Sequence, residues 1–204
     1  MNTKALYNIT YGVYLLSANE NGKDNACIIN TAVQVANNPT RISIAAIKGN
    51  LTHDMVLSTG RFNLSAISTD APYSLFQHFG MQSGRSVDKF ADFADVARSN
   101  NGLYYLTKYA NAFLSLKVTE SIDLGSHTLF IAELEDAEVL SNESCCTYGY
   151  YQTNINQMLL NQQQTLDGNA RSAATYMKAA SYQITTPAHF VNMAQKISSI
   201  LKNS

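Results

Sequence analysis

The stretch NACIINTAVQVANNPTRISIAAIKGNLTHDMV, residues 25–56, decides the fold of this chain. Within it, residues 26–35 and 41–47 are rich in Ile, Val and small residues, which predicts two short strands. Asn and Pro at positions 37–39 interrupt the pattern and predict a turn between them. A helix is expected to begin after Asn50, because Thr and Asp follow at positions that suit a first helical turn.

The region before this stretch predicts one more strand in the same sheet. Residues 9–18, ITYGVYLLSA, are rich in β-branched and aromatic types, and the Asn-Gly pair at 21–22 is a strong hairpin signal. Residues 26–35 then read as the returning strand. Three consecutive strands with tight connections predict an antiparallel meander.

The remaining strand signals extend this mainly β pattern as far as residue 140. Further strands are predicted at 62–67, 112–120 and 127–140, and a short helix near Pro72. Short strands without regular alternation of strand and helix are typical of a closed or nearly closed antiparallel barrel.

Composition excludes several classes of function. At 204 residues with 46% hydrophobic and 14% charged residues, the chain suits a globular domain with a packed core. The net charge is −1 and Lys and Arg are scattered, so no nucleic acid partner is expected. No apolar run approaches the roughly 18–20 residues of a membrane span, and no signal peptide is evident. We expect a cytoplasmic protein without a membrane partner.

Cysteines and histidines give no sign of a metal centre. The three cysteines are an odd number, which suits a reducing compartment better than a disulfide framework. Cys145 and Cys146 are adjacent and leave open a redox pair or half of a metal site, although two small half-buried residues are the favoured interpretation. The four histidines form no ligand motif, and the chain has no P-loop, GxSxG or GxGxxG motif, so no metal is predicted.

The composition changes near Gln152, where Gln and Asn become frequent and strand signals end. We therefore predict a barrel domain over residues 1–151 and a helical C-terminal extension over 152–204. The last helix is expected to begin at Thr186 and to carry an apolar stripe suited to core or dimer packing.

Two groups of polar residues next to apolar strands are candidate ligand contacts. Gln82 to Arg85 combine a hydroxyl, a glycine and a guanidinium, which suits capture of a phosphate, although a solvated turn is the commoner role. Residues 30–32 and 47–52 offer amides and hydroxyls beside apolar side chains, as a flavin ring requires. A bulge at Asn30 and a helix cap at Thr52 are the alternatives.

Three segments in order resemble the flavin reductase-like FMN-binding family, and most closely its flavoredoxins and the flavin domain of high-molecular-weight rubredoxins. They are residues 25–56, HFGMQSGRSVDKF at 78–90 and GSHTLFIAELEDAEVL at 125–140. With ALYNITYGVYLLSA at 5–18 and TYGYY at 147–151, the resemblance extends over about three quarters of the chain.

The resemblance implies a fold and a site. The fold is an FMN-binding split β-barrel, antiparallel and Greek-key-like, with short peripheral helices, and the protein is a homodimer with FMN near the interface. His127 would lie at the nicotinamide face, and Thr31 or Thr52 would donate a hydrogen bond to the ring. The flavin ring and ribityl chain would be contacted by Asn30, Thr31, Ala32, Gln34, Ile47, Lys48, Asn50, Leu51 and Thr52. The phosphate side would comprise His78, Phe79, Ser83, Gly84, Arg85 and Lys89.

The resemblance also implies an activity. Electrons would pass from NADH or NADPH through FMN to a flavin, iron or protein acceptor. Two alternatives stay open: a flavoredoxin-like carrier that a partner protein reduces, and an FMN-binding module without nicotinamide turnover. Because no CxxC pairs for a rubredoxin iron centre follow residue 151, we expect a diffusible acceptor or a separate rubredoxin-like or other electron-transfer partner.

Overall fold

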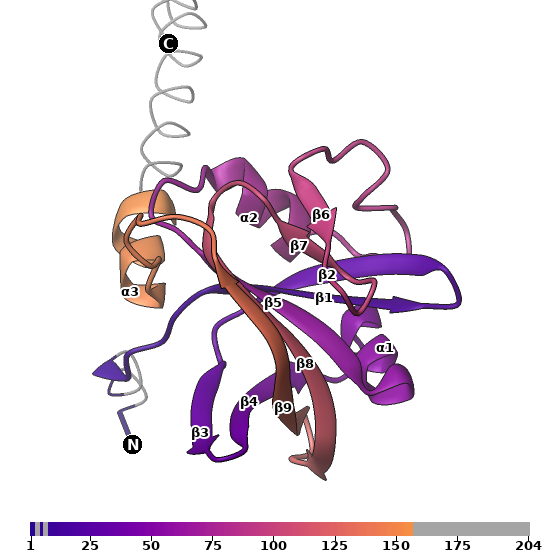
Figure 1. Cartoon of the computed structure of the whole chain (residues 1–204). Coiled ribbons are helices and arrows are strands. Elements are labelled where there is room, and N and C mark those ends of the chain that lie inside the picture. The colour runs from indigo at the N-terminus through magenta and orange to yellow at the C-terminus, as the bar shows by residue number, and fades with distance from the viewer. Residues whose placement is uncertain (3–4, 6–7, 157–204) are drawn as a thin grey trace, which may run out of the picture. The chain divides into compact units, whose positions relative to one another are not determined.

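The computed structural model describes residues 1–2, 5 and 8–156 (Figure 1). A compact unit extends from Met1 to Thr153. The predicted boundary between residues 151 and 152 lies close to the end of this unit. Most of the predicted C-terminal extension, including the helix expected after Thr186, lies outside the described residues.

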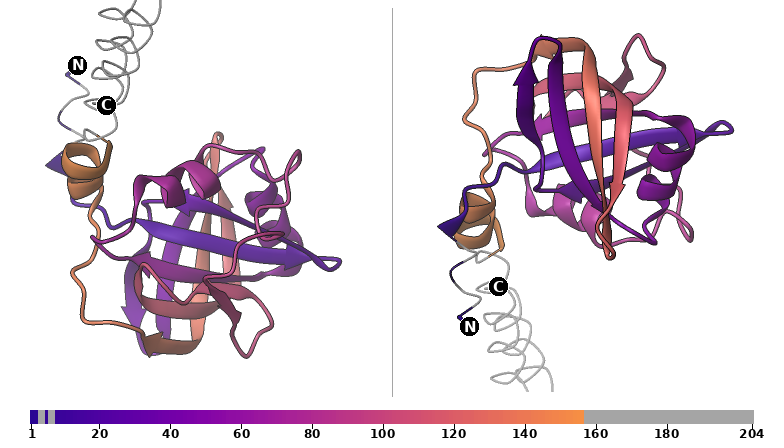
Figure 2. Two further views of the ribbon diagram at one scale, coloured as in Figure 1. Left: turned by 90° about the horizontal axis from the view of Figure 1, so that it is seen from above. Right: turned by 90° about the horizontal axis from the view of Figure 1, so that it is seen from below.

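Seven strands of this unit form one sheet in the order β2-β1-β5-β8-β9-β4-β3. Every strand pairs antiparallel with its neighbours, which confirms the predicted mainly β, antiparallel fold. The sheet curls into a barrel with β2 and β3 at its two edges (Figure 2). The strands are β1 (Tyr14–Glu20), β2 (Lys23–Ile29), β3 (Val33–Asn37), β4 (Thr40–Ile47), β5 (Arg61–Ile67), β8 (Ala110–Asp123) and β9 (His127–Val139).

The single strand predicted over residues 26–35 is wrong. The structure has two strands there, β2 and β3, and they belong to opposite edges of the sheet. Residues 30–32 cross from one edge to the other, so the expected meander becomes two separate hairpins, β1–β2 and β3–β4. The apolar composition is continuous across this crossing, which explains why the sequence pattern does not mark it.

The barrel interior is filled by apolar side chains that alternate along the strands. Leu16, Ile44, Phe62, Leu64 and Phe130 are at most 1% exposed and belong to one buried cluster. Burial of large aliphatic and aromatic groups supplies most of the favourable free energy of folding. This packing holds the strand ends that carry the candidate site.

Two helices flank the barrel where the sequence predicts them. Helix α1 (Leu51–Thr59) begins at Asn50, whose side chain accepts a hydrogen bond from the Thr52 amide at 3.1 Å, and ends at Gly60 with a φ of 66°. Helix α2 (Tyr73–Gly80) follows Pro72.

The hairpin of β6 (Val96–Arg98) and β7 (Tyr104–Leu106) has no counterpart in the predictions, because its strands are three residues long. The described chain ends with α3 (Tyr148–Tyr150) and a π-helical turn at Tyr151–Ile155. In the part of the chain that the structure describes, no helix is long and apolar enough to span a membrane.

Candidate functional site

Two loops that are distant in sequence meet at the N-terminal end of α1. One joins β4 to α1, and the other follows α2 and contains Ser83, Gly84 and Arg85. The Arg85 guanidinium donates to the Gly49 carbonyl at 3.4 Å. Gly84 lies against the buried Asn25, and no space for a side chain remains between them. Asn25 in turn donates to the Thr52 hydroxyl at 2.9 Å, so three segments are fixed together here.

The electrostatics of this end of α1 favour an anion. Backbone amides of the first helical turn point outward and carry the positive end of the helix dipole. Arg85 adds a full positive charge and is about half exposed, and its guanidinium pairs with Asp54. The hydrogen bond from His53, and then Arg85, hold the pKa of the Asp54 carboxyl below its usual value. A phosphate reaching Arg85 would therefore compete with one carboxylate.

His53 supports this arrangement from inside the protein, and sequence reasoning did not assign it a role. Its Nδ1 lies 2.9 Å from Asp54 Oδ1, and its Nε2 lies 2.8 Å from Thr128 Oγ1. A neutral ring satisfies both contacts by donating from Nδ1 and accepting at Nε2. The buried His53 thus connects β9, through Asp54, to Arg85. The only sign of this role in the sequence is that a polar residue, His53, falls on the buried side of a helix.

The predicted nicotinamide-side residue His127 lies at the start of β9, directly opposite Ile47 at the end of β4. Its Nδ1 is 2.9 Å from the Ser126 hydroxyl. The Lys48 amide donates to the Ser126 carbonyl at 3.0 Å, and the Lys48 ammonium pairs with Asp123. Lys48 and then the Gly125 amide lower the pKa of Asp123. The structure thus brings Ile47, Lys48 and His127 together at one end of the barrel.

Thr31 has a structural task that the prediction did not foresee. The β3–β4 ladder pairs Val33 with Ser43, so residue 31 would face Ala45 in the same register. The Thr31 hydroxyl takes that place: it donates to the Ala45 carbonyl at 2.8 Å and accepts from the Ala45 amide at 3.1 Å. A hydroxyl has one proton, so the predicted donation from Thr31 to a flavin does not fit this arrangement.

Lys89 and Phe79 are also placed differently from the prediction. The Lys89 ammonium is 2% exposed and donates to the carbonyls of Ala26 and Phe79, both at 2.8 Å. Burial lowers its pKa. The Phe79 side chain is fully buried. Neither side chain presents itself to a phosphate, because both are used to hold α2 and the following loop on β2.

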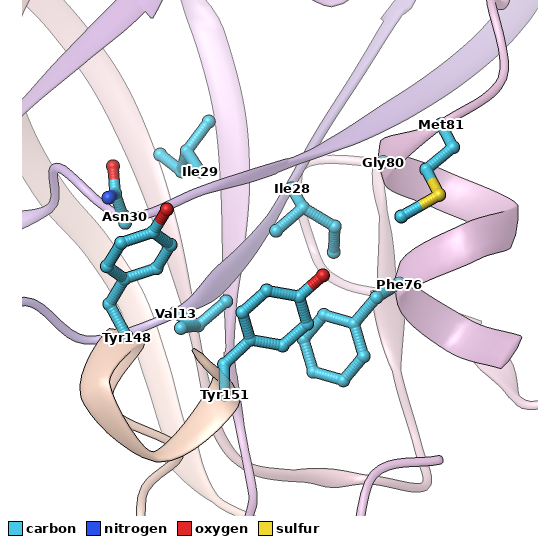
Figure 3. A pocket seen from close by; sticks show the side chains of 9 residues that line it. All are labelled: Val13, Ile28, Ile29, Asn30, Phe76, Gly80, Met81, Tyr148 and Tyr151. Carbon is cyan, nitrogen blue, oxygen red and sulfur yellow. The ribbon is translucent and has the colours of Figure 1, made fainter. Parts of the chain in front are cut away.

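Four further residues that were predicted to contact FMN are His78, Gln34, Ala32 and Asn30. His78 donates from Nε2 to the Lys89 carbonyl at 2.7 Å and stacks on Phe93. Gln34 is exposed on β3, where its amide donates to the Ala36 carbonyl at 3.2 Å. Ala32 packs against the core. Asn30 lines a pocket of about 290 Å³ that also includes Tyr148 and Tyr151 (Figure 3).

Comparison with known proteins places these features in a family. The model of the flavin reductase like domain matches residues 6–158, which is most of the chain. The chain belongs to the flavin reductase-like family. A high-molecular-weight rubredoxin of Moorella thermoacetica is 36% identical over 151 residues, and a ferric-chelate reductase (NAD(P)H) of Archaeoglobus fulgidus is 33% identical over 151 residues. Both matches cover 74% of this chain, but only 66% of the first relative and 89% of the second.

Solved structures of the family confirm the split-barrel fold. An FMN-binding protein from Thermus thermophilus superimposes with a TM-score of 0.61 and 20% identity, covering 67% of this chain and 74% of that chain. A flavoredoxin from Methanosarcina acetivorans gives a TM-score of 0.59 and 22% identity, covering 68% and 73%. At these identities the likeness concerns the fold.

Proposed function

We propose that this flavin reductase-like protein binds FMN and passes electrons from NADH or NADPH through it to an acceptor. The observation that carries the proposal is the meeting of two loops at the N-terminal end of α1. Arg85 meets the first turn of α1 there, and Ser83 belongs to the same loop as Arg85. A guanidinium, a hydroxyl and first-turn amides beyond the one that Asn50 caps are donors that suit a phosphate monoester. These residues fit the phosphate of FMN.

The ring of FMN would lie beside the edge formed by Ile47 and His127. Ile47 is 53% exposed and offers an apolar surface, while Lys48 and His127 supply polar groups at the same end of the barrel. When bound, the flavin would supply the redox chemistry, accepting a hydride from the nicotinamide. His127 would orient the nicotinamide, and Arg85 would hold the phosphate. Thr31 and Lys89 keep the structural roles described above.

The proposal also covers the electron acceptor, the cellular compartment and the oligomeric state. We propose that electrons leave to a diffusible flavin or ferric compound or to a separate electron-transfer protein. Among the described residues, no group of three or more His, Cys, Asp and Glu is placed to hold a metal ion. All three cysteines are free, in keeping with a reducing cytoplasm. We further propose a homodimer, and a barrel domain over residues 1–151 that a helical extension follows.

A spectroscopic titration tests the proposal. The purified protein is mixed with FMN, and the shift of the flavin absorbance bands reports binding. Anaerobic NADH and NADPH are then added in separate stopped-flow runs. Rapid bleaching of the bound flavin is expected, and His127→Ala should slow bleaching while FMN still binds.

The outcomes separate the alternative functions. Bound flavin that ignores both nicotinamides but accepts electrons from a reduced carrier protein would indicate a flavoredoxin-like carrier, which the 36% identity to a high-molecular-weight rubredoxin favours as the second candidate. Flavin that no physiological donor reduces would indicate a binding module. A protein that does not bind FMN would overturn the proposal.

A further inference from the structure

The pocket beside Asn30 carries chemistry that the proposed phosphate and nicotinamide contacts do not use. Its walls come from the end of β2, from α2 and from the α3 segment (Figure 3). Tyr151 packs against Phe76 with ring centroids 4.7 Å apart, and Met81 lies on the far side of the pocket. These side chains form an aromatic and polarisable surface that suits a planar ring.

One end of the pocket is polar. The Tyr148 hydroxyl and the Asn30 amide both lie at this end of the pocket (Figure 3). Neither group forms a hydrogen bond with another described residue, so both can donate to a ligand. A phenol and an amide donor that face the same space favour a carbonyl oxygen.

The lining also restricts the charge and size of the ligand. All the lining side chains are uncharged. A charged ligand would lose its hydration without a compensating partner, so a neutral one is favoured. The volume of about 290 Å³ is at the lower end for ligand pockets, which suits one or two rings and not a dinucleotide.

We propose that this pocket binds a neutral quinone, which serves as an electron acceptor of the protein. The inference rests on the proposed flavin function for its electrons. Reduced flavin would give up two electrons and two protons, and the two carbonyl groups of the quinone would take them up to become hydroxyl groups. The Tyr148 phenol would hydrogen-bond one quinone oxygen, and Tyr151 would contact the ring face.

Isothermal titration with tetramethyl-1,4-benzoquinone tests the binding step on the full chain. This probe is fully substituted, so the exposed thiol of Cys145 has no unsubstituted ring position to attack. Tyr148→Phe removes one neutral hydrogen bond and should weaken binding about 2- to 10-fold. Tyr151→Ala should weaken it by roughly tenfold or more, because an aromatic face is lost. Tyr105→Phe removes the same atom on β7, outside the pocket, and should leave binding unchanged.

Two ligand controls test the chemistry. Tetramethylbenzene has the same ring without carbonyls, and tetramethylbenzoate has a similar shape with a negative charge. Both should bind more weakly than the quinone. Equal binding of all three, or equal effects of Tyr148→Phe and Tyr105→Phe, would overturn the inference.

Titrations with and without FMN separate this inference from the proposed function. Quinone binding to the flavin-free protein that persists after FMN is added supports a separate acceptor site. Loss of quinone binding on adding FMN, together with weaker FMN binding by Tyr148→Phe, would show that the pocket holds the flavin ring and would overturn the inference. Binding of FMN without binding of quinone also overturns it and leaves the proposed function standing. Binding of quinone without binding of FMN refutes the proposed function and, with it, the role of the quinone as an electron acceptor.

Discussion

Arg85 is the side chain on which the proposed phosphate site depends most. Its guanidinium is held at the end of α1 by Asp54 and by the Gly49 carbonyl, so little ordering is needed when a phosphate arrives. His53 fixes the carboxylate of Asp54 from the other side. This pre-ordering distinguishes Arg85 from an ordinary surface arginine.

Replacing Arg85 by Ala is expected to weaken FMN binding by roughly 10- to 100-fold, because a charge-assisted hydrogen bond contributes about 1.5–3 kcal/mol. Fluorescence titration of FMN measures the change. Arg61→Ala is the matched control, since Arg61 pairs with Glu135 at 3.0 Å and lies on β5. Unchanged affinity in Arg85→Ala would remove this residue from the phosphate site.

Because of the Cys146 thiol, we expect the free energy of unfolding to fall at alkaline pH. Burial, and then the neighbouring Cys145, raise its pKa from 9.0 to about 11. Between these values the unfolded chain has lost the proton that the folded protein still holds, so the free energy of unfolding falls as pH rises. Urea unfolding at about pH 8 and pH 10.5 should show a smaller decline for Cys146→Ala than for the wild type. Equal declines would contradict the raised pKa.

At the scale of elements, the loop after α2 depends on a close approach. A methyl group at Gly84 would collide with the side chain of Asn25, which is buried and bound to Thr52. Gly84→Ala should therefore lower the free energy of unfolding by about 1–3 kcal/mol and weaken FMN binding as the loop moves away. Differential unfolding in urea and FMN titration measure both effects.

Gly149→Ala provides the matched control for this variant. Gly149 lies within α3, and a methyl group there would meet only ordinary van der Waals contact. Alanine is also the better helix former, so stability should stay the same or rise slightly. If both variants lose the same stability, the contact between Gly84 and Asn25 is not what holds the loop.

Much of the element order was predictable from local patterns. The helix start after Asn50, the Asn-Gly turn at 21–22 and the strand of residues 41–47 each have a short-range chemical cause, and the structure confirms them. The cap itself is Asn50 and not Thr52, which lies in the first helical turn. The split of residues 26–35 was not predictable in the same way, because it follows from the closure of the sheet. Local composition does not record which strands become its edges.

The site was predictable in part, through the resemblance, and its details depend on long-range contacts. The approach of Arg85 to Gly49 joins loops 36 residues apart. The burial of Lys89 and the use of the Thr31 hydroxyl on Ala45 arise from tertiary packing. From residue type alone, a lysine or a threonine could equally bind a ligand or hold the backbone in place. Only the folded structure shows which of these two roles Lys89 and Thr31 have.

At the scale of the whole molecule, the β3 edge presents exposed apolar side chains. Val33 and Val35 are 59% and 53% exposed, and they lie on the outermost strand of the sheet. Exposed apolar side chains on an edge strand favour association with another surface. This surface is our candidate for the proposed homodimer contact.

Val35→Lys should convert the proposed dimer to monomers, because a charge would be buried in the contact. Sedimentation velocity at micromolar concentration measures the change. Val139→Lys is the control, since Val139 is 74% exposed at the end of β9. A wild-type protein that sediments as a monomer would refute the dimer, and a dimer that persists in Val35→Lys would place the contact elsewhere.

The crossing at residues 30–32 has a consequence for motion. No ladder joins β2 to β3, the two edges of the sheet, and residues 30–32 connect them as covalent chain. Separation of these two edges therefore breaks no ladder hydrogen bond, and we predict that the barrel opens here more readily than between paired strands. A ligand bound across these edges would reduce the amplitude of this opening. Deuterium uptake by the amides of β2 and β3 would then slow when FMN is added, while uptake in β8 stays constant.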